Sequence, residues 1–540
     1  MKQKSSKFMD ALRDGRPANI LKRRYRRTDY DLKFWVILLF CAISVLLVLI
    51  GSYSIFSSFI GVQEPSKPVP KSSILKLSLT VAAGCSGLFA LTVAIRNHLL
   101  NERRRFTENF GSAANQLADS DPAVRIAGVF AMDGVAEQAI NFVQRQQCID
   151  VLCGYLRLSN NAGQANDQNI SVNANVQGID LPAQNQIPEL SYRQNDGEVR
   201  ASILHIFAEH LRATGVQSWS IYNFNFSNVH FENIDFSNTV FRGESVSFES
   251  AIFSGDRCSF QNTEFSGSHV SFNNAKFFGS KTSFEHAKFY GHNTSFNGVR
   301  FVGKCTDFDE AEFRSNNTHF KEVKFDSSVT SFERARTYGD VLSFKNSRIR
   351  SRDINFVGAR FYSKTVSFEG VRFKGKKVLF RESYFLGNST IFDNAVFRDH
   401  TSFEGAEFVG LRVSFDRAAF KGREARFDGS QFQLESANFS RTKFLSSITS
   451  FVDAKFFKKS ITFDGCRFGG NSVSFRQAQF YEGVEVTFRK AHFIANETSF
   501  IDVRFEGHVD FRNPGSWNPE PLFDWTGPNS VVSQPSNVDL

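Results

Sequence analysis

Phenylalanine recurs through the second half of the sequence in pairs whose members lie five residues apart. The stretch SFNNAKFFGSKTSFEHAKFYGHNTSF (271–296) carries the same phrase twice. From Phe248 to Phe392 the first member of the pair returns every 12 residues, and 25 first members are present. Only Thr337 and Ile349 replace a second member. The register then shifts by single residues at Phe403, Phe488 and Phe511. A chain with 62 Phe but only 11 Tyr and 4 Trp uses one side chain for a repeated geometric purpose, which predicts a repeat architecture.

A second rule concerns the residue two places before a Phe of the pairs, which is small or β-branched at the following positions. Before second members stand Ala251, Thr263, Ala275, Ala287 and Val299, and before first members Val246, Cys258, Val270, Thr282 and Thr294. An amphipathic helix needs apolar residues every 3.6 positions, and a two-sided strand needs strict alternation over a longer run. The pattern fits neither. It predicts a chain that turns a corner after each short bridge, with both positions facing inward.

With these two inward positions, residues 226–511 resemble the pentapeptide repeat family. The resemblance implies an all-β right-handed quadrilateral β-helix. The segment QLADSDPAVRIAGVFAMDGVA also resembles the helical region before the repeats in some membrane-anchored bacterial members. This sequence departs from the plain family pattern because alternate connections have seven residues rather than five. We therefore expect 12 residues per half coil and about 24 per coil.

The predicted structural core is represented by Phe248, Phe253, Phe260, Phe265, Phe272, Phe277, Phe284, Phe289, Phe296 and Phe301. Glycine often falls two places after the second Phe, where we expect a wider corner to use a positive φ angle. These glycines are Gly255, Gly267, Gly279, Gly291, Gly303, Gly375, Gly387 and Gly422. About 12 coils at about 4.8 Å each predict a rod about 60 Å long.

Two uncharged stretches, 34–63 and 77–95, precede the repeats, and each is long enough to cross about 30 Å of hydrocarbon as a helix. A signal peptide is a weaker interpretation of the first, which is too long and lacks a small-x-small cleavage site. The segment 1–33 carries 11 basic and 4 acidic side chains, and NERRRF follows the second stretch. The loop between them has fewer basic residues than either flank. The positive-inside rule then predicts a two-pass membrane protein with both termini in the cytoplasm. The resemblance to membrane-anchored bacterial members implies that this membrane is the bacterial inner membrane.

The sequence divides into seven expected segments. They are a basic N-terminus (1–33), two transmembrane helices with a short loop (34–96), a helical juxtamembrane segment (97–158), a disordered Asn/Gln-rich linker (159–192), a capping helix (193–216), the β-helix (217–511) and a C-terminal tail (512–540). In the juxtamembrane segment, Asp121 stands where an N-cap belongs and Pro122 at the first helical position. Trp517 and Trp525 lie in a tail that either covers the end of the rod or trails from it.

Catalytic and metal-binding motifs are missing from the sequence. There is no P-loop, nucleophile elbow or His-Glu-x-x-His motif, and the seven Cys show no ligand or disulfide spacing. We therefore expect no enzymatic activity and no cofactor, and we interpret the Cys as small hydrophobic residues in a reducing compartment. Activity on a cell-envelope polymer is a further alternative, but it requires the rod to lie outside the cytoplasm.

Basic residues precede many second Phe residues and mark a candidate anion-binding column. Because two half coils complete a turn, alternate members should stack on one face, namely Lys276, Arg300, Lys324, Arg348 and Arg372. Acidic residues that follow first Phe residues are expected within reach of this column and would partly neutralise it: Glu249, Glu285, Asp309, Glu333 and Glu369. We therefore favour a solvated, partly compensated surface, with a functional anion-binding stripe as the alternative.

The leading hypothesis is a non-enzymatic, membrane-tethered rod that presents a rigid surface to a cytoplasmic protein partner. The alternative is an anion-binding module that engages lipid headgroups or nucleic acid. No aromatic side chains interleave with the basic column, so single-stranded nucleic-acid binding has no support in the sequence. Some family members act as acidic DNA mimics toward topoisomerases. Residues 226–511 carry a net charge of +5, from 39 basic and 34 acidic side chains, which argues against that role here.

Overall fold

The computed structural model describes residues 71–158, 196–212, 218–511 and 515–524, with shorter pieces between residues 43 and 58 and at 532–533. The chain forms two compact units, Met1–Asn109 and Phe110–Leu540. The predicted basic N-terminus, most of the first uncharged stretch and the predicted Asn/Gln-rich linker lie outside the described residues.

The second uncharged stretch belongs to helix α3 (Lys71–Leu117), which has 47 residues. No proline or glycine interrupts the sequence between residues 88 and 110, so the helix continues past the boundary expected at residue 96. In the part of the chain that the structure describes, no helix is both long enough and apolar enough to span a membrane. The two membrane-spanning helices therefore remain a prediction from the sequence.

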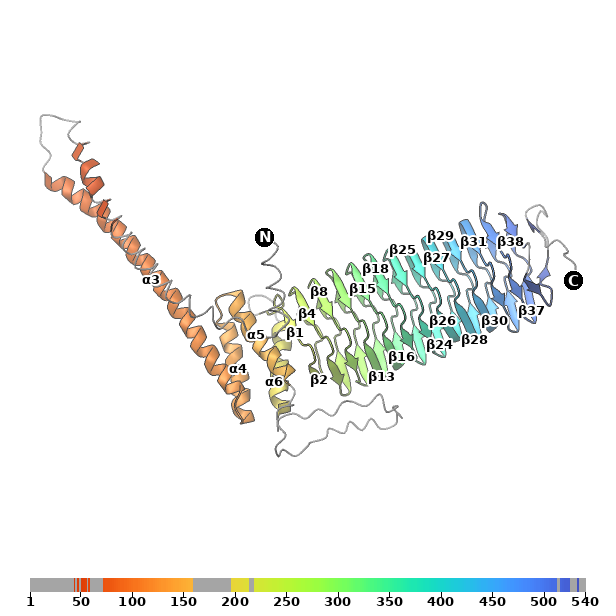
Figure 1. The fold of residues 1–540 in the computed structure, drawn as a ribbon, viewed down its shortest axis with the longest axis horizontal. Coiled ribbons are helices and arrows are strands. Elements are labelled where there is room, and N and C mark those ends of the chain that lie inside the picture. The colour runs from red at the N-terminus through yellow and green to blue at the C-terminus, as the bar shows by residue number, and fades with distance from the viewer. Residues whose placement is uncertain are drawn as a thin grey trace, which may run out of the picture. The chain divides into compact units, whose positions relative to one another are not determined.

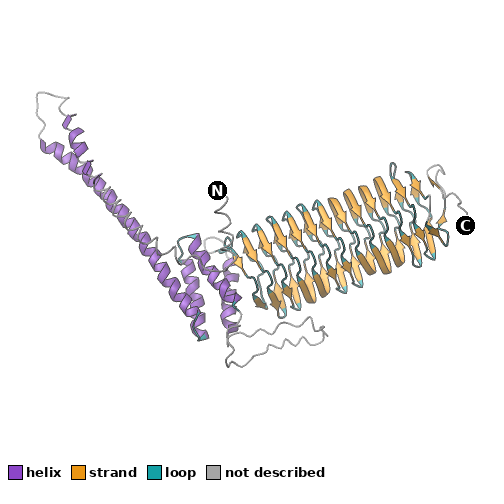
Figure 2. Ribbon diagram, viewed as in Figure 1, coloured by secondary structure: helices purple, strands orange, loops and turns teal. Residues whose placement is uncertain are grey.

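Between α3 and the strands, the described residues form three shorter helices, drawn in purple in Figure 2. They are α4 (Pro122–Glu137), α5 (Phe142–Arg157) and α6 (Asp196–Arg212). The start of α4 confirms the predicted cap, because the Asp121 side chain accepts a 2.8 Å hydrogen bond from the Ala123 N–H and Pro122 opens the helix. The three helices share a core that includes Val129, Met132, Ile149, Leu152 and Ile203, all fully buried.

The described residues from Phe224 onward form a parallel β-solenoid of about 12 turns, which confirms the predicted repeat architecture. The strands of the described residues lie in two sheets: a 22-stranded sheet, here sheet A, and a 20-stranded sheet, here sheet B. They form the upper and lower rows of strands in Figure 1. In one turn, the chain passes through sheet A in β11 (Lys288–Phe289) and β12 (Asn293–Ser295) and through sheet B in β13 (Arg300–Asp307). It returns to sheet A in β14 (Glu312–Phe313), which pairs with β11.

Each half coil turns its corner directly after the first Phe. The residue two places after that Phe has a φ between 52° and 69° throughout residues 228–502, and this residue is most often Asn or Gly. In one example, the Ala251 N–H donates to the Phe248 carbonyl at 3.1 Å, and Ser250 between them has a φ of 57°. A four-residue turn of this kind needs a left-handed residue in third position, which Gly and Asn adopt most easily. Positive φ angles are therefore used mainly at the corner after the first Phe, rather than at the corner after the second Phe.

The prediction that all eight glycines after second Phe residues use positive φ is wrong for half of them. Gly255, Gly291, Gly303 and Gly422 have positive φ, whereas Gly267, Gly279, Gly375 and Gly387 do not. Close approach of the previous turn explains glycine at three of the remaining positions. A Cβ on Gly267 would collide with the Gly243 carbonyl oxygen, and one on Gly375 would lie 2.6 Å from the Ser351 oxygen. A Cβ on Gly387 would collide with the Ser363 oxygen.

The single-residue shifts in the Phe spacing fall in the longer connections and leave the core unchanged. At the first shift, the strand register slips between Arg398 and His400. The ring of Phe403 nevertheless stacks on that of Phe380 at 4.8 Å. Phe463 and Phe488 are separated by one position more than the usual period, and their rings also stack at 4.8 Å. The longer connections therefore absorb insertions and deletions.

Helices α5 and α6 cover the first turn of the solenoid. The ring of Phe207 in α6 packs edge to face against Phe224 and Phe226, at 5.5 and 5.6 Å. Side chains from the helices donate to carbonyl oxygens of this turn: Arg157 to Asn225 at 2.7 Å and Arg212 to Asp235 at 2.9 Å. These bonds satisfy backbone groups that have no preceding turn to pair with.

At the other end, the solenoid continues past the predicted boundary at residue 511. Strand β40 (Ser516–Trp517) pairs with β36 (His492–Phe493), so Trp517 occupies the place of a second Phe. Strand β41 (Leu522–Phe523) pairs with β37 (Glu497–Phe500), and Phe523 stacks on Phe500 at 5.0 Å. The described part of the segment predicted as a tail therefore adds to the last turn. Trp525 lies outside the described residues.

Candidate interaction faces of the solenoid

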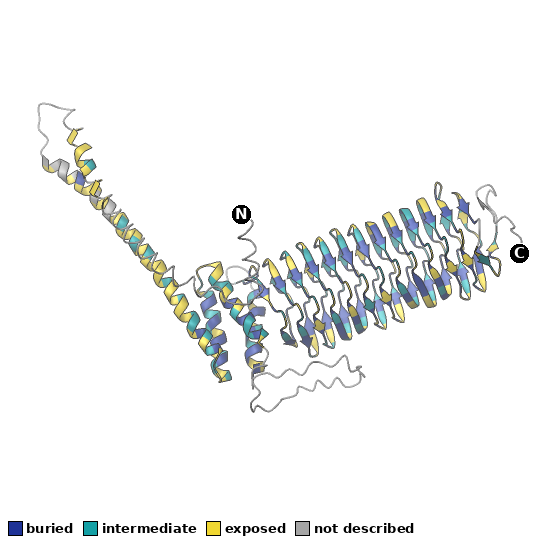
Figure 3. Ribbon diagram, viewed as in Figure 1, coloured by how far each residue is buried: buried dark blue, intermediate teal, exposed yellow. Residues whose placement is uncertain are grey.

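The ten Phe residues chosen as the core are all 0% exposed. They form four columns, because each ring stacks on the equivalent ring of the next coil. Phe248 lies 4.7 Å from Phe272, Phe253 4.3 Å from Phe277, Phe260 4.9 Å from Phe284, and Phe265 5.0 Å from Phe289. Figure 3 shows buried and exposed positions alternating along the strands. The outward positions of the two sheets are therefore the surfaces available for binding.

The five basic residues of the candidate anion-binding column lie side by side in sheet B. Lys276 pairs in register with Arg300, Arg300 with Lys324, Lys324 with Arg348, and Arg348 with Arg372. Ile252 precedes the column and Val396 follows it in the same register. The structure thus brings all five cations together on one face over five consecutive turns.

The acidic residues expected to neutralise this column make their contacts elsewhere. Glu369 forms an ion pair with Lys345 at 2.9 Å, and Asp309 accepts from the Glu333 N–H at 2.8 Å. They sit at the corners, where the chain leaves the sheet. Within the column, Arg300 contacts Asp326 at 3.3 Å. Among the described residues, no carboxylate lies within 4.0 Å of the other four cations, Lys276, Lys324, Arg348 and Arg372.

A second set of cations, which the sequence analysis missed, enlarges the basic surface of sheet B. It occupies the position after the second Phe and includes Arg350, Lys374, Arg398 and Lys421. Arg398 and Lys421 are in register. Together with Arg348, Arg372, Lys376 and Lys377, these residues make up what we call the basic patch. Desolvation and then the neighbouring guanidinium groups, Arg350 first, hold the pKa of Lys374 below its usual value.

An open hollow of about 260 Å³ borders the basic column at a corner. Its lining residues are Gly298, Glu322, Val323, Lys324, Asn346 and Arg348. Lys324 and Arg348 supply positive charge to this hollow, whereas Glu322 supplies a negative one. The hollow is therefore less selective for anions than the flat patch beside it.

Sheet A carries a different chemistry at the position after the second Phe. We call this column the aromatic stripe, formed by Tyr290, Tyr338, Tyr362, Leu386, Val409, Phe457 and Tyr481, with Arg314 and Gln433 completing it. The rings of Tyr338 and Tyr362 stack at 5.2 Å, and the Arg314 guanidinium lies 4.7 Å from the Tyr338 ring centre. Phe457 stacks on Tyr481 at 4.4 Å. These side chains are partly exposed, and Leu386 is 39% exposed.

The aromatic stripe lies in sheet A and not in the basic column, so it leaves unaffected the expectation that no aromatic side chains interleave with that column. Arg314 lies between Tyr290 and Tyr338 in the stripe. The aromatic stripe is hard to recognise in the sequence because its members lie one full coil apart. The half coil between two members belongs to the other sheet, so the tyrosines look isolated. Since Tyr338 and Tyr362 stack on each other, their ring faces are partly occupied and their edges are exposed. This arrangement suits a protein surface better than intercalating bases.

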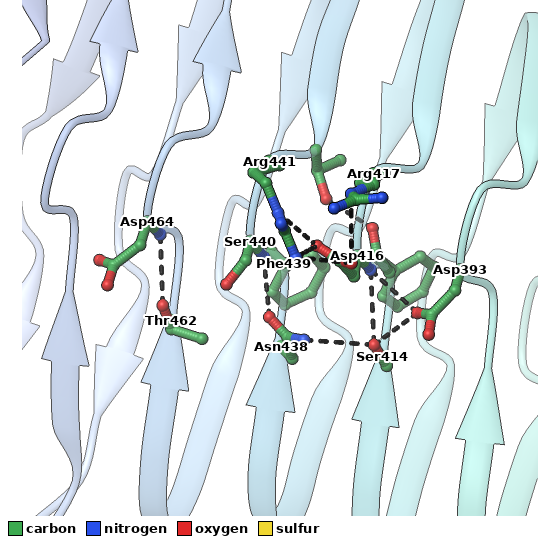
Figure 4. A network of polar contacts seen from close by, with 12 residues as sticks. Asp393, Ser414, Asp416, Arg417, Asn438, Phe439, Ser440, Arg441, Thr462 and Asp464 are labelled. Carbon is green, nitrogen blue, oxygen red and sulfur yellow. Dashed lines mark hydrogen bonds and ion pairs between the residues drawn. The ribbon is translucent and has the colours of Figure 1, made fainter.

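A network of polar side chains holds the corners that follow sheet A, as Figure 4 shows. The Asp416 N–H donates to Asp393 at 3.0 Å, and Arg441 donates two hydrogen bonds to the Asp416 carboxylate, at 3.0 and 2.9 Å. Asn438 donates to Ser414 at 3.4 Å, and the Asp464 N–H donates to Thr462 at 3.2 Å. Asp393 and Asp416 are engaged with backbone N–H or guanidinium groups, so this network stabilises turns.

The described residues contain no group of three or more His, Cys, Asp or Glu side chains arranged to hold a metal ion. Burial raises the pKa of the Cys148 and Cys153 thiols to about 12. Both are fully buried, as expected for cysteines that act as small hydrophobic residues.

Comparison with known protein families finds a similarity for two segments of the solenoid. No curated protein and no solved structure shows a significant match to the chain. The family model described as pentapeptide repeats matches residues 226–276 and 463–513, with nine copies. These two segments lie at opposite ends of one continuous solenoid whose Phe columns run through both. Residues 226–276 and 463–513 are accordingly similar to pentapeptide repeats.

Proposed function

We propose that this chain is a non-enzymatic scaffold whose solenoid presents the aromatic stripe of sheet A to a protein partner. The observation that carries this proposal is the row of partly exposed Tyr, Leu, Val and Phe side chains along one face. Tyrosine, phenylalanine and arginine are enriched at protein interfaces, and rigid aromatic side chains bury large areas at a low entropic cost. A repeat solenoid with a stacked core is stiff, so a partner would meet a preorganised surface.

We also propose that the N-terminal part tethers the scaffold to the bacterial inner membrane by two passes, with both termini in the cytoplasm. The absence of charge over residues 34–63 and 77–95 supports the tether. In α3, Leu79, Leu88, Leu91 and Ile95 are more than half exposed. A helix with so many exposed apolar side chains is stabilised by a lipid or protein environment. Carbonate extraction and a C-terminal topology reporter test this proposal; a reporter active only outside the cytoplasm would contradict it.

Site-specific photo-crosslinking in cells tests the docking face. A photo-reactive residue at Tyr362 should give a crosslinked species of defined mass, and Leu386→Lys should remove it. The same residue at Arg334, at an exposed corner, is the matched control and should give no such species. Equal products from both positions, or none from Tyr362, would contradict the assignment of sheet A as the docking face.

Anion binding by sheet B is the second candidate function. It is favoured by the four cations of the column that have no carboxylate within 4.0 Å among the described residues. Reversal of Arg300, Lys324, Arg348 and Arg372 to Glu should abolish association with anionic vesicles or DNA if the column binds anions, and unchanged association would remove this candidate. A topoisomerase-directed DNA mimic stays a remote alternative, because its surface needs negative charge where sheet B is basic.

A further inference from the structure

The basic patch of sheet B has the geometry of a planar phosphate-binding surface. Arg348 and Arg350 lie on one turn, two residues apart on the same side of the strand, and Arg372 and Lys374 occupy the same places on the next. The backbone positions that carry neighbouring cations are therefore separated by about 4.8 Å between turns and about 6.7 Å along a strand. Arg398 and Lys421 extend the array over two more turns. The result is a two-dimensional array of cations.

The charge of this array is largely uncompensated. Acidic residues near it are already engaged: Asp326 with Arg300 at 3.3 Å, Asp353 with Arg352 at 3.0 Å, and Asp399 with Arg423 at 3.5 Å. Of the eight patch residues, Arg350 alone has a carboxylate within 4.0 Å among the described residues, at 4.0 Å from Asp326. An array of like charges without carboxylate partners stores repulsion that phosphate oxygens would relieve.

The floor beneath the patch is rigid. Ile349, Phe373, Phe397 and Phe420 alternate with the patch cations along the strands, and all are 0% exposed. The rings of Phe373 and Phe397 stack at 4.8 Å, and those of Phe397 and Phe420 at 4.6 Å. The cations are therefore displayed from a fixed surface, so that only their side chains lose freedom when an anion binds.

We infer that the basic patch binds the phosphate groups of an anionic lipid surface, so that sheet B lies against the membrane. This inference rests on the second candidate function and specifies its ligand. A flat sheet face complements a flat layer of headgroups. Protein surfaces that bind single strands combine cations with aromatic side chains for base stacking, and the patch contains none. The uncharged stretches of the same chain favour a location at a membrane.

Lysine footprinting of the full-length chain tests the inference. The protein is mixed in detergent with phosphatidylcholine, alone or with phosphatidylglycerol, the detergent is removed, and amine acylation is read by mass spectrometry. We expect phosphatidylglycerol to protect Lys374, Lys376, Lys377 and Lys421, while Lys288 and Lys455 on sheet A stay unchanged. High salt should remove the protection, because the attraction between exposed charges is screened.

Matched triple variants complete the test. Arg350→Glu, Lys374→Glu and Arg398→Glu together should remove the protection of Lys376 and Lys377, since each charge near an anionic surface changes affinity by about fivefold. Lys288→Glu, Arg360→Glu and Lys455→Glu change the net charge equally on sheet A and should leave the protection intact. Equal loss in both variants would overturn the inference, as would protection by duplex DNA in neutral vesicles without an effect of phosphatidylglycerol. Flotation with neutral vesicles reports the tether separately, so its failure is distinguishable from failure of the patch.

Discussion

The ring of Phe296 lies 4.7 Å from the ring of Phe320, its counterpart in the next coil, and the two planes are 2° apart. On its other side, Phe296 stacks on Phe272 at 4.8 Å. It also meets Phe284 and Phe308 edge to face at 5.7 and 5.8 Å. Each ring thus stabilises its own column and the columns beside it. The aromatic core is continuous along the solenoid.

Truncation of Phe296 should destabilise the solenoid locally. Phe296→Ala is expected to cost about 3 to 5 kcal/mol, because a buried ring is replaced by a cavity. Phe296→Leu should cost less, since most of the volume is kept. Amide hydrogen exchange over residues 272–320 would measure both. Phe296→Asp should prevent this region from folding because the charge has no partner. Unchanged protection in the Ala variant would contradict an inward position for this ring.

Gly387 should resist substitution for a reason other than its φ angle. Gly387→Ala places a Cβ against the Ser363 carbonyl oxygen of the previous turn, so we expect a loss of about 1 to 3 kcal/mol. Gly429 is the matched control, with a φ of 63° and nothing within 4 Å of an added Cβ. Gly429→Asn should be nearly neutral, because Asn adopts left-handed backbone readily. Thermal unfolding of the two variants compares them; equal melting temperatures would be inconsistent with the close approach.

Acidification should loosen the covered end of the solenoid through His230. Burial, and then the charge of Arg200, lower the pKa of His230 to about 4 from an ordinary value near 6.5. The folded state therefore holds fewer protons than the unfolded state between these values. The stability that depends on neutral His230 is present above pH 6.5 and is lost as pH falls, by about 2 kcal/mol at pH 5. Hydrogen exchange over residues 224–254 should rise on acidification in the native protein and rise less in His230→Gln.

Removal of the charge of Asp309 should stabilise the protein near neutral pH. Burial, with a further contribution from Asp307, raises the pKa of Asp309 to about 6 although the Ser331 hydroxyl donates to it. Stability is therefore lost as pH rises from the ordinary Asp value of 3.8 to about 6, and the loss is complete above that value. An uncharged amide can make the same contact with the next turn: the Asn297 side chain accepts a hydrogen bond from the Lys321 N–H at 3.0 Å. For the partly exposed Asp309, Asp309→Asn should gain about 1 kcal/mol at pH 8.

The pH dependence provides the control for this variant. Near pH 4 the native carboxyl is protonated, so Asp309→Asn and the native protein should unfold at the same urea concentration. A gain that persists unchanged at pH 4 would show that ionisation of Asp309 is not the cause.

The repeat, its coil period and the inward Phe columns could be predicted because a half coil that recurs 25 times leaves few geometries that satisfy it. The basic column could be predicted from the same coil period, and Lys276, Arg300 and Lys324 are in register as expected. The partners of these cations could not be predicted. Whether the Asp309 or the Asp326 carboxylate contacts the basic column depends on where the chain turns its corners. The positions of these corners could not be predicted from the sequence.

The aromatic stripe and the end of the solenoid were missed for related reasons. Tyr338 and Tyr362 look unrelated in the sequence, because consecutive half coils belong to different sheets. Trp517 lies six residues after Phe511, whereas the two members of a Phe pair lie five apart, yet it pairs with Phe493 as a second Phe would. The longer connections tolerate such shifts, so strict periodicity underestimates the length of the fold.

Cysteine cross-linking across adjacent turns tests the central claim that the coil period separates two faces. In a background with Cys41, Cys85 and Cys305 replaced by Ser, Tyr338→Cys with Tyr362→Cys should cross-link rapidly with a short bismaleimide. Tyr338→Cys with Arg350→Cys, which are closer in sequence but on opposite sheets, should not cross-link. Efficient cross-linking of the second pair with none in the first would contradict the period, and with it the separation of the aromatic stripe from the basic patch.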